Sequence, residues 1–410
     1  MILEKFIPNN WHGSILLAGA LFGLVTASVT AQNQNIKFDG SLGTAGSNGK
    51  NAALLNGPNY AIQIEDGQLE SSNLFHSFEA FALTMGETAT FESTGITNIL
   101  TRVTGGAASS IDGGITANAN LFFMNPNGVM FGPNSSLNVS GAFTVTTADR
   151  INLDPAAGGG VFAVSKAGFL TAPSGVRGAV SLEGANLSSS SFHVISGDVT
   201  LQDDAQISSV DGPASIISVG PGAGTVDLSQ IGSATGPTFE GVDALAAKFG
   251  SLGNITVTSD SSIESTNVFA PGAPQKIVIR SGQLQVLNGG SLFALGVDSI
   301  PEEGSIDVGT QSLVNVDSMG GGFTNLAANG DLKIKTSSLR VANGGSVATN
   351  AFRISLAGIT TLTEGGNISI QADDIDVSGG FVEAVTRFST DAGSISIQSD
   401  NLTVQNDGII

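Results

Sequence analysis

The side chains best suited to chemistry in this 410-residue chain are three pairs of adjacent acids, Asp203-Asp204, Glu302-Glu303 and Asp373-Asp374. Neighbouring carboxylates can bind calcium, or they can serve as the acid pair of a polysaccharide-cleaving enzyme. A β-helical enzyme of that kind also needs Arg or Lys gathered on one face, whereas the 15 basic residues here are spread along the chain. We therefore favour solvent-exposed corner residues for all three pairs.

His76 is the other candidate, as a proton shuttle or a metal ligand, and the only other histidine beyond residue 31 is His193. Two histidines without further ligands make a poor metal site, so for His76 we favour a ring hydrogen-bonded at a turn. The chain has no cysteine, which removes disulfides, thiolate metal sites and a cysteine nucleophile. It also lacks the serine elbow, HExxH, Walker and dinucleotide motifs. We expect no catalytic residue, no metal and no cofactor.

The composition favours an all-β protein. The chain holds 35 acids against 15 bases, a net charge of −20, which argues against nucleic acid as a partner because phosphate binding needs clustered Lys and Arg. Apolar residues make up 41% of the chain, and 55 glycines accompany many Val, Ile, Thr and Phe. Such a chain can bury a core and turn often, which is typical of short strands joined by tight turns.

Residues 1–31 are predicted to be a secretory signal peptide. Lys5 lies in a short polar segment, and Ser14 to Val25 form an apolar run too short to span a bilayer comfortably. Small residues precede the expected cleavage site after Ala31, with cleavage after Ala27 as the alternative. An uncleaved membrane anchor is the competing interpretation.

A repeated pattern of short alternating segments predicts a solenoid beyond residue 253. A second short strand follows four of these segments, and Gly-Gly or Asn-Gly-Gly then marks a corner. One coil cannot bury its apolar face alone, but stacked coils share a continuous core, and at this period we expect about 15 of them. The repeated segments are 254–258, 276–280, 305–309, 331–335, 367–371 and 394–398. The chain stops at residues 406–410 within such a coil, which suggests a truncated or fragmentary sequence.

Two earlier stretches differ from the repeats. In residues 70–83, Leu74, Phe75, Phe78 and Phe81 recur at spacings that predict a short helix or a compact cap over the end of the core. Residues 121–149 read as short strands separated by two tight turns, Asn125-Pro126-Asn127-Gly128 and Gly132-Pro133-Asn134.

The second of these stretches resembles the secretion domain of the filamentous haemagglutinin family, the exoproteins of two-partner secretion. The resemblance covers residues 35–150. It is carried by NPNGVMFGPN (125–134), LNVSGAF (137–143) and TTA (146–148), with supporting matches SNLFHSF (72–78), ILTRVTG (99–105) and ANANLF (117–122).

This resemblance implies a right-handed parallel β-helix with an N-terminal cap. Domains would be a signal peptide (1–31), a secretion domain (32–150) and a β-helix repeat region (151–410). Export would use the Sec machinery and then an outer-membrane β-barrel partner with periplasmic docking domains. The transporter-recognition motif would be Asn125, Pro126, Asn127 and Gly128, although some members carry Leu where Gly128 stands. Supporting motif residues would be Asn73, Leu74, Phe75, His76, Phe78, Arg102, Phe131, Gly132 and Pro133.

We therefore expect a non-enzymatic adhesin, secreted or attached to the outer surface of a Gram-negative-type bacterium. The later repeats are similar to those of long cyanobacterial members. Glycans or proteins of a host or cell surface are candidate ligands. The alternatives are a β-helical polysaccharide-active enzyme and the secretion module of a longer effector or toxin.

Overall fold

The computed structural model describes residues 36–153, 160–163, 178–222, 226, 241–266, 275–296, 304–319, 324–350, 353–356, 359–362, 366–385 and 393–410. All of them belong to one compact unit, Gln34–Ile410. The predicted signal peptide and its cleavage site at Ala31 lie outside the described residues. Among the helices of the described part, none has the length and apolar character needed to cross a bilayer.

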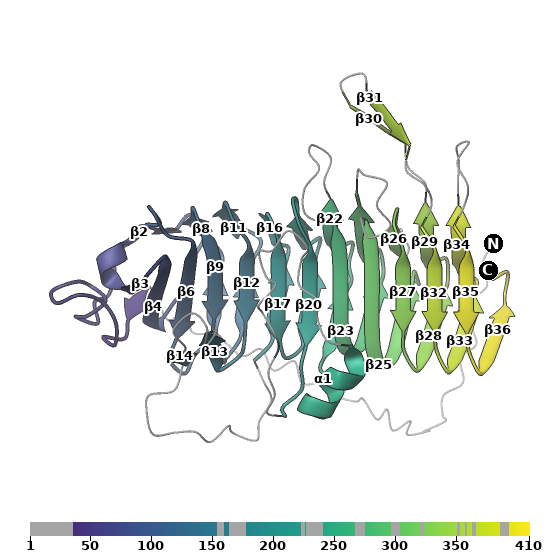
Figure 1. Ribbon diagram of the computed structural model, residues 1–410, viewed down its shortest axis with the longest axis horizontal. Helices are drawn as coiled ribbons and strands as arrows, with labels where there is room; N and C mark the ends of the chain where they lie inside the picture. Colours follow the sequence, from purple (N-terminus) through teal and green to yellow (C-terminus); the bar gives the residue numbers. More distant parts are fainter. Residues whose placement is uncertain are drawn as a thin grey trace, which may run out of the picture. The chain divides into compact units, whose positions relative to one another are not determined.

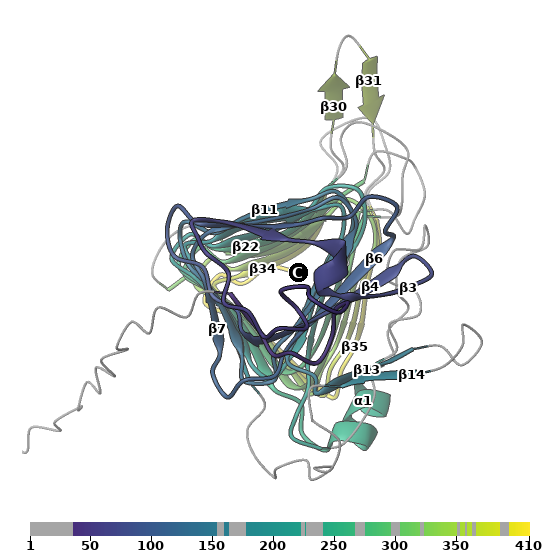
Figure 2. The ribbon, with the colours of Figure 1, turned by 90° about the vertical axis from the view of Figure 1, so that its left-hand side faces the viewer.

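The unit is a parallel β-helix with three faces, so the expected β-helical fold is confirmed (Figure 1). The chain runs along face 1, then face 2, then face 3, and begins the next coil. Seen along the stack, the faces enclose one shared core (Figure 2). Each strand pairs in parallel with its counterparts in the neighbouring coils, so every coil supplies backbone partners for the next.

Face 1 consists of β4 (Asn73–Ala80), β6 (Asn98–Val103), β9 (Asn120–Met124), β12 (Phe143–Thr146), β17 (Phe192–Ser196), β20 (Ala214–Ser218), the first halves of β23 (Lys276–Leu287) and β25 (Ser305–Asp317), β27 (Leu332–Lys335), β32 (Ile368–Gln371) and β35 (Ile395–Gln398).

Face 2 consists of β7 (Ser109–Ile111), β10 (Val129–Phe131), β15 (Val180–Glu183), β18 (Val199–Gln202), β21 (Asn254–Val257), the second halves of β23 and β25, β28 (Ser338–Ala342), β33 (Asp374–Ser378) and β36 (Asn401–Gln405).

Face 3 has two ladders. The first comprises β2 (Asn59–Ile62), β5 (Thr88–Phe91), β8 (Gly114–Ala117) and β11 (Ser136–Val139). The second comprises β16 (Asn186–Ser189), β19 (Gln206–Ser209), β22 (Ser262–Thr266), β24 (Ser291–Leu295), β26 (Asn325–Ala328), β29 (Ser346–Asn350) and β34 (Phe381–Val385).

Two antiparallel hairpins and one helix interrupt this order. The hairpins are β13 (Arg150–Leu153) with β14 (Gly160–Ala163), and β30 (Arg353–Leu356) with β31 (Ile359–Leu362). The helix α1 (Val242–Phe249) lies between β20 and β21. Because such insertions consume residues, face 1 carries eleven strands in the described part of the chain, and the expectation of about 15 coils was too high.

One of the predicted repeat segments lies on a different face from the others, because α1 is inserted before it. The segments that begin at residues 276, 305, 331, 367 and 394 lie on face 1, as a common repeat requires. The segment at 254–258 does not, because β21 pairs with the second half of β23, Asn254 opposite Gln283. The face-1 strand of that coil is β20, and the helix that follows it shifts the apparent period.

Residues 70–83 form neither the predicted helix nor the cap itself but contain β4, the first strand of face 1. The cap is the segment before it, where β1 (Lys37–Phe38) and β3 (Gln68–Glu70) pair antiparallel with β4. The 3-10 helix η1 (Ile64–Asp66) completes it. Apolar residues of β4 point both inward and outward, since a hairpin covers its outer side, and this removed the simple alternation that identifies a strand.

An asparagine ladder ties the first three coils together where face 1 begins. Nδ2 of Asn98 donates to Oδ1 of Asn73 at 2.8 Å, and Nδ2 of Asn120 donates to Oδ1 of Asn98 at 2.9 Å. Oδ1 of Asn120 then accepts the main-chain N–H of Ala142 at 2.9 Å. Asn73, one of the supporting motif residues, is thus the first member of a structural ladder.

Replacing Asn98 with alanine should lower the free energy of unfolding by about 1–2 kcal/mol, since it removes two half-buried hydrogen bonds, one accepted by Oδ1 of Asn73 and one donated by Nδ2 of Asn120. Urea unfolding monitored by circular dichroism would measure the loss. Asn254→Ala, at an exposed first position of β21, is the matched control and should cost under about 0.5 kcal/mol. Equal losses in both variants would contradict a stabilising ladder.

Candidate recognition site

The Asn125–Gly128 motif forms the corner between β9 on face 1 and β10 on face 2. The Asn125 side chain is 0% exposed. Its Nδ2 donates to the carbonyl of Ala107 at 3.1 Å and to Oγ of Ser109 at 3.0 Å. Its Oδ1 accepts the main-chain N–H of Asn127 at 3.0 Å. Asn125 therefore holds its own turn closed and joins it to the corner of the preceding coil.

The following coil packs tightly against the same corner. Gly128 has φ +116°, a left-handed conformation that other residues adopt only with strain. The N–H of Gly178 donates to the carbonyl of Pro126 at 3.2 Å, and that of Val129 to the carbonyl of Ala179 at 3.0 Å. A Cβ on Gly178 would lie 2.4 Å from the Gly128 nitrogen, so only glycine fits there.

Burial divides the motif into two parts. Asn125 and Gly128 are buried, Pro126 is half-buried and Asn127 is exposed. Asn127 is anchored by Nδ2, which donates to the carbonyl of Gly105 at 2.8 Å. A partner arriving from solvent would meet Asn127 and Pro126, whereas the other two residues determine how that pair is presented.

Among the described residues, Asn127 lies next to small, uncharged side chains. The exposed neighbours are small, Ala107, Ala108 and Ala179, with Met130 of β10 37% exposed beside them. None of residues 104–110, 125–130 and 178–181 carries a charge, in a chain whose net charge is −20. Such a patch can be covered by a partner without desolvating ions.

Several supporting motif residues lie in the core and not at this surface. The inward side chains of β4 are Leu74, His76 and Phe78, each 0% exposed, and Phe131 of β10 is buried as well. Phe78 stacks on Phe38 of the cap with ring centroids 4.8 Å apart. These positions support the coil and cannot contact a partner.

His76 contradicts our expectation of a hydrogen-bonded turn residue. It lies in a strand, and neither ring nitrogen makes a well-formed hydrogen bond. Burial lowers its pKa to about 4, and Asp66, through its charge and its main chain, offsets only part of that effect. His193, on the outward side of β17, is also buried without a partner, and burial lowers its pKa to about 3. Both rings are therefore neutral at physiological pH.

Arg102 and Phe75 lie on the outward side of face 1, beneath the β13–β14 hairpin. The Phe75 ring meets Phe162 of β14 edge-on at 5.1 Å, and the Arg102 guanidinium lies 4.7 Å from the Phe162 centroid. Arg102 also donates from Nε to Oγ of Ser77 at 2.8 Å and from Nη2 to Oγ of Ser41 at 3.2 Å. Arg102 thus joins the cap, β4 and the hairpin.

The second turn, with Gly132 and Pro133, forms a different corner at the opposite end of β10. There the main-chain N–H of Asn134 donates to Oδ1 of Asp112 in the preceding coil at 2.8 Å. A Cβ on Gly132 would come 2.5 Å from that same oxygen. The two Pro-Asn turns therefore do not form one surface.

The acid pairs do not assemble a site in the described residues. Asp203 and Asp204 occupy a corner with φ +60° and +63°, and Oδ1 of Asp374 accepts from Nδ2 of Asn401 at 2.7 Å. Glu302-Glu303 lies outside the described residues. Across the described part of the chain, no group of three or more His, Cys, Asp or Glu residues is placed to hold a metal ion.

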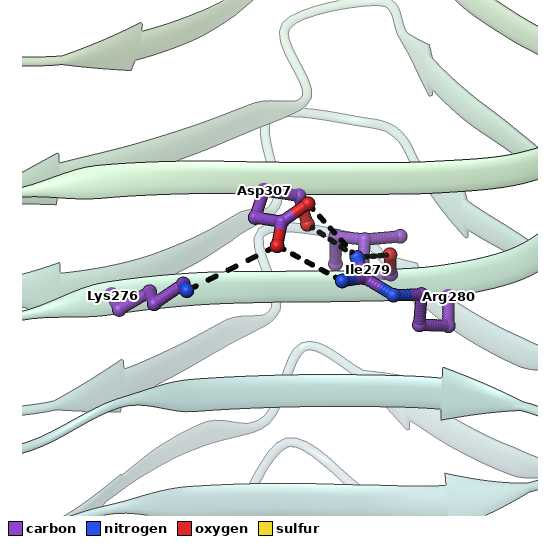
Figure 3. Close-up of polar contacts among 4 residues, drawn as sticks. All are labelled: Lys276, Ile279, Arg280 and Asp307. Atoms are coloured by element: carbon purple, nitrogen blue, oxygen red, sulfur yellow. Dashed lines mark hydrogen bonds and ion pairs between the residues drawn. The ribbon is translucent and has the colours of Figure 1, made fainter. Parts of the chain in front are cut away.

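One ion pair under α1 was not anticipated from the sequence (Figure 3). Arg280 of β23 donates from Nη1 and Nη2 to the two carboxylate oxygens of Asp307 on β25, at 3.1 and 2.9 Å, and Lys276 lies 3.9 Å from the same carboxylate. Burial raises the pKa of Asp307, but Arg280, with the charges of Lys276 and Lys333, outweighs it, so the net pKa is below its usual 3.8. Asp307 lies 27 positions or more from Arg280 and Lys276 in the chain and meets them because β23 and β25 pair in neighbouring coils.

Comparison with known families shows to which protein family the chain belongs. A family model for the TPS secretion domain, the module of two-partner secretion, matches residues 34–267, which is more than half of the chain. The chain therefore belongs to the two-partner secretion exoproteins of the filamentous haemagglutinin type. Proteins of this class cross the outer membrane of Gram-negative bacteria through a dedicated transporter partner.

Among solved structures, the crystal structure of the HMW1 secretion domain from Haemophilus influenzae aligns with 82% of this chain and 96% of its own, at 16% identity and a TM-score of 0.35. No curated protein sequence matches the chain. The family match extends past the expected domain border at residue 150, which is also the first residue of β13.

Proposed function

We propose that the corner Asn125–Gly128 is the element that the periplasmic docking domains of the transporter recognise, with Asn127 and Pro126 as the contacting residues. The observation that carries this proposal is the division of the motif into a buried frame, Asn125 and Gly128, and one exposed amide, Asn127, whose described neighbours carry no charge. An exposed amide offers a donor and an acceptor, and small neighbours allow another main chain to approach closely.

The remainder of the export route follows from the same proposal. Residues 1–31 would direct Sec-dependent export to the periplasm, with cleavage after Ala31. The secretion domain would begin at residue 32 and include the β13–β14 hairpin beyond residue 150, since that hairpin packs on β4, β6 and β9. The β-helix beyond would then be threaded outward through the outer-membrane barrel.

Outside the cell, we infer a non-enzymatic exoprotein of adhesin type on the surface of a Gram-negative bacterium, with a cyanobacterium as the source and host or cell-surface glycans or proteins as ligands. The support for a non-enzymatic role is the burial and ionisation of Arg280 and Asp307, an arginine and a carboxylate that lie together on face 1. Arg280 is 6% exposed and bonded to Asp307, whose lowered pKa keeps it ionised at neutral pH. Neither group is poised to exchange a proton with a substrate.

Replacing Asn127 with alanine tests the recognition proposal. Co-expression with the partner transporter should show secretion reduced about tenfold or more, because a side chain at the centre of an interface contributes at least 1–2 kcal/mol. The urea midpoint of the purified chain should change little, since water can replace the lost bonds at this exposed site. Asn138→Ala, an exposed asparagine on face 3, is the matched control. Normal secretion of the Asn127 variant would refute the contact.

A further inference from the structure

The helix α1 lies on the outer side of the β-helix, against face 1 (Figure 1). Its sequence places Val242, Leu245 and Phe249 on one side, at spacings of three and four, and all three are buried. Gly250 ends the helix with φ +79°, and its N–H donates to the carbonyl of Ala246 at 2.8 Å. Eight residues are too few for a helix that is stable alone, so α1 depends on the surface beneath it.

That surface comes partly from coils that precede α1. The buried face of the helix packs on Ile195 of β17, Ile217 of β20 and Val219. We call the apolar surface beneath the helix its bed. These residues are already present in the chain when α1 is made.

The other part of the bed comes from coils that follow α1. Val278 of β23 packs in the same apolar cluster, and Gly309 of β25 lies so close that an added Cβ would be 3.3 Å from Cβ of Val242. Gln311 of β25 accepts the main-chain N–H of Leu252 with Oε1 at 2.5 Å and donates from Nε2 to the carbonyl of Gly250 at 3.2 Å.

A further exposed ion pair joins Asp243 of α1 to Lys335 of β27. Contacts of α1 therefore extend 92 residues downstream.

The β13–β14 hairpin provides a contrast. Its bed on face 1 consists of Phe75, Leu100 and Met124, which all precede it in the chain. The hairpin can dock as soon as it exists, whereas α1 lacks half of its bed until β23 and β25 are in place.

We propose that α1 is a strap that closes only after the coils of β23 and β25 have formed. The family match ends at residue 267, between the two parts of the bed. Closure of the strap thus fastens the secretion module to the repeats beyond it and stabilises that border after the downstream coils have folded. This device is independent of the proposed role of Asn127.

Pulsed thiol alkylation of the full chain tests the strap, because the chain has no cysteine of its own. Three single-cysteine variants report separate events during refolding: Val242→Cys for α1, Val308→Cys for the core of β25 and Ile151→Cys for the hairpin. We expect Val242→Cys to become protected after Val308→Cys. Protection of Val242→Cys before Val308→Cys would overturn the proposal.

A second substitution makes the test independent of the refolding order. Adding Gln311→Ala should raise the alkylation rate of native Val242→Cys roughly tenfold, since two hydrogen bonds that hold the strap are lost. The rate for Ile151→Cys should not change. Gln371→Ala, an exposed glutamine on face 1 outside the α1 bed, is the control. An unchanged rate for Val242→Cys in the Gln311 variant would also overturn the proposal.

Discussion

Replacing Asn125 with alanine is expected to lower the free energy of unfolding by about 3 kcal/mol and to abolish secretion. The substitution removes a side chain that is 0% exposed and leaves the carbonyl of Ala107, the Ser109 hydroxyl and the N–H of Asn127 without their bonds. A buried polar group left unpaired costs about 1–3 kcal/mol, and water has little access to replace the amide. Denaturant unfolding of the purified chain and a secretion assay would measure the two effects.

Asn127→Ala is the informative comparison, since the two asparagines lie in the same turn but differ in burial. The Asn127 variant should lose secretion with nearly native stability, whereas the Asn125 variant should lose both. If the Asn125→Ala variant had the same denaturant midpoint as the native chain yet was not secreted, Asn125 would contact the transporter. Our proposal that it only positions the turn would then be wrong.

The second large effect is a loss of stability in mild acid, caused by the two buried histidines. In the folded chain the pKa of His76 is lowered to about 4 and that of His193 to about 3, against an ordinary value of 6.5. The unfolded chain therefore takes up these protons first as the pH falls below 6.5. Stability should decline from there until the pH passes the folded pKa values, and it should be flat in this respect above 6.5.

The size of this effect is measurable. At about 1.4 kcal/mol per pKa unit, moving from pH 7.5 to pH 5 should cost roughly 2 kcal/mol for each histidine. Lowered carboxyl pKa values, such as those of Asp39 and Asp307, contribute only at more acid pH. Urea unfolding at the two pH values would show the loss, and His76→Leu with His193→Leu should remove most of it. A double variant with the same pH dependence as the native chain would rule out the histidines as its cause.

Local patterns predicted much of this structure. The alternating segments from residue 276 onward became face-1 strands, because period-two burial is a property of the strand itself. Asn-Gly-Gly at 288–290 and 343–345 became corners with positive φ, because few residues other than Gly and Asn adopt that conformation readily. The Asn125–Gly128 turn was predicted for the same reason.

Errors arose where burial depended on other coils. In β4 the outward Phe75 is covered by Phe162, 87 positions later in the chain. This apolar residue on the outward side breaks the alternation expected of a strand, and the segment was predicted as a short helix or cap. The helix α1 was missed although Val242, Leu245 and Phe249 are spaced for one side of a helix and Gly250 follows. Three apolar positions within eight residues are too short a pattern to distinguish a helix from the surrounding strands.

By itself, then, the sequence determined the repeating strands, the turns and the secretion family, since each depends on residues close together in the chain. Only the tertiary structure decided what each motif residue does. Burial of Asn125 and exposure of Asn127 result from packing between three successive coils, as do the pairing of Arg280 with Asp307 and the bed of α1. Such contacts join residues that stacking brings into register, and their spacing varies with every insertion between coils.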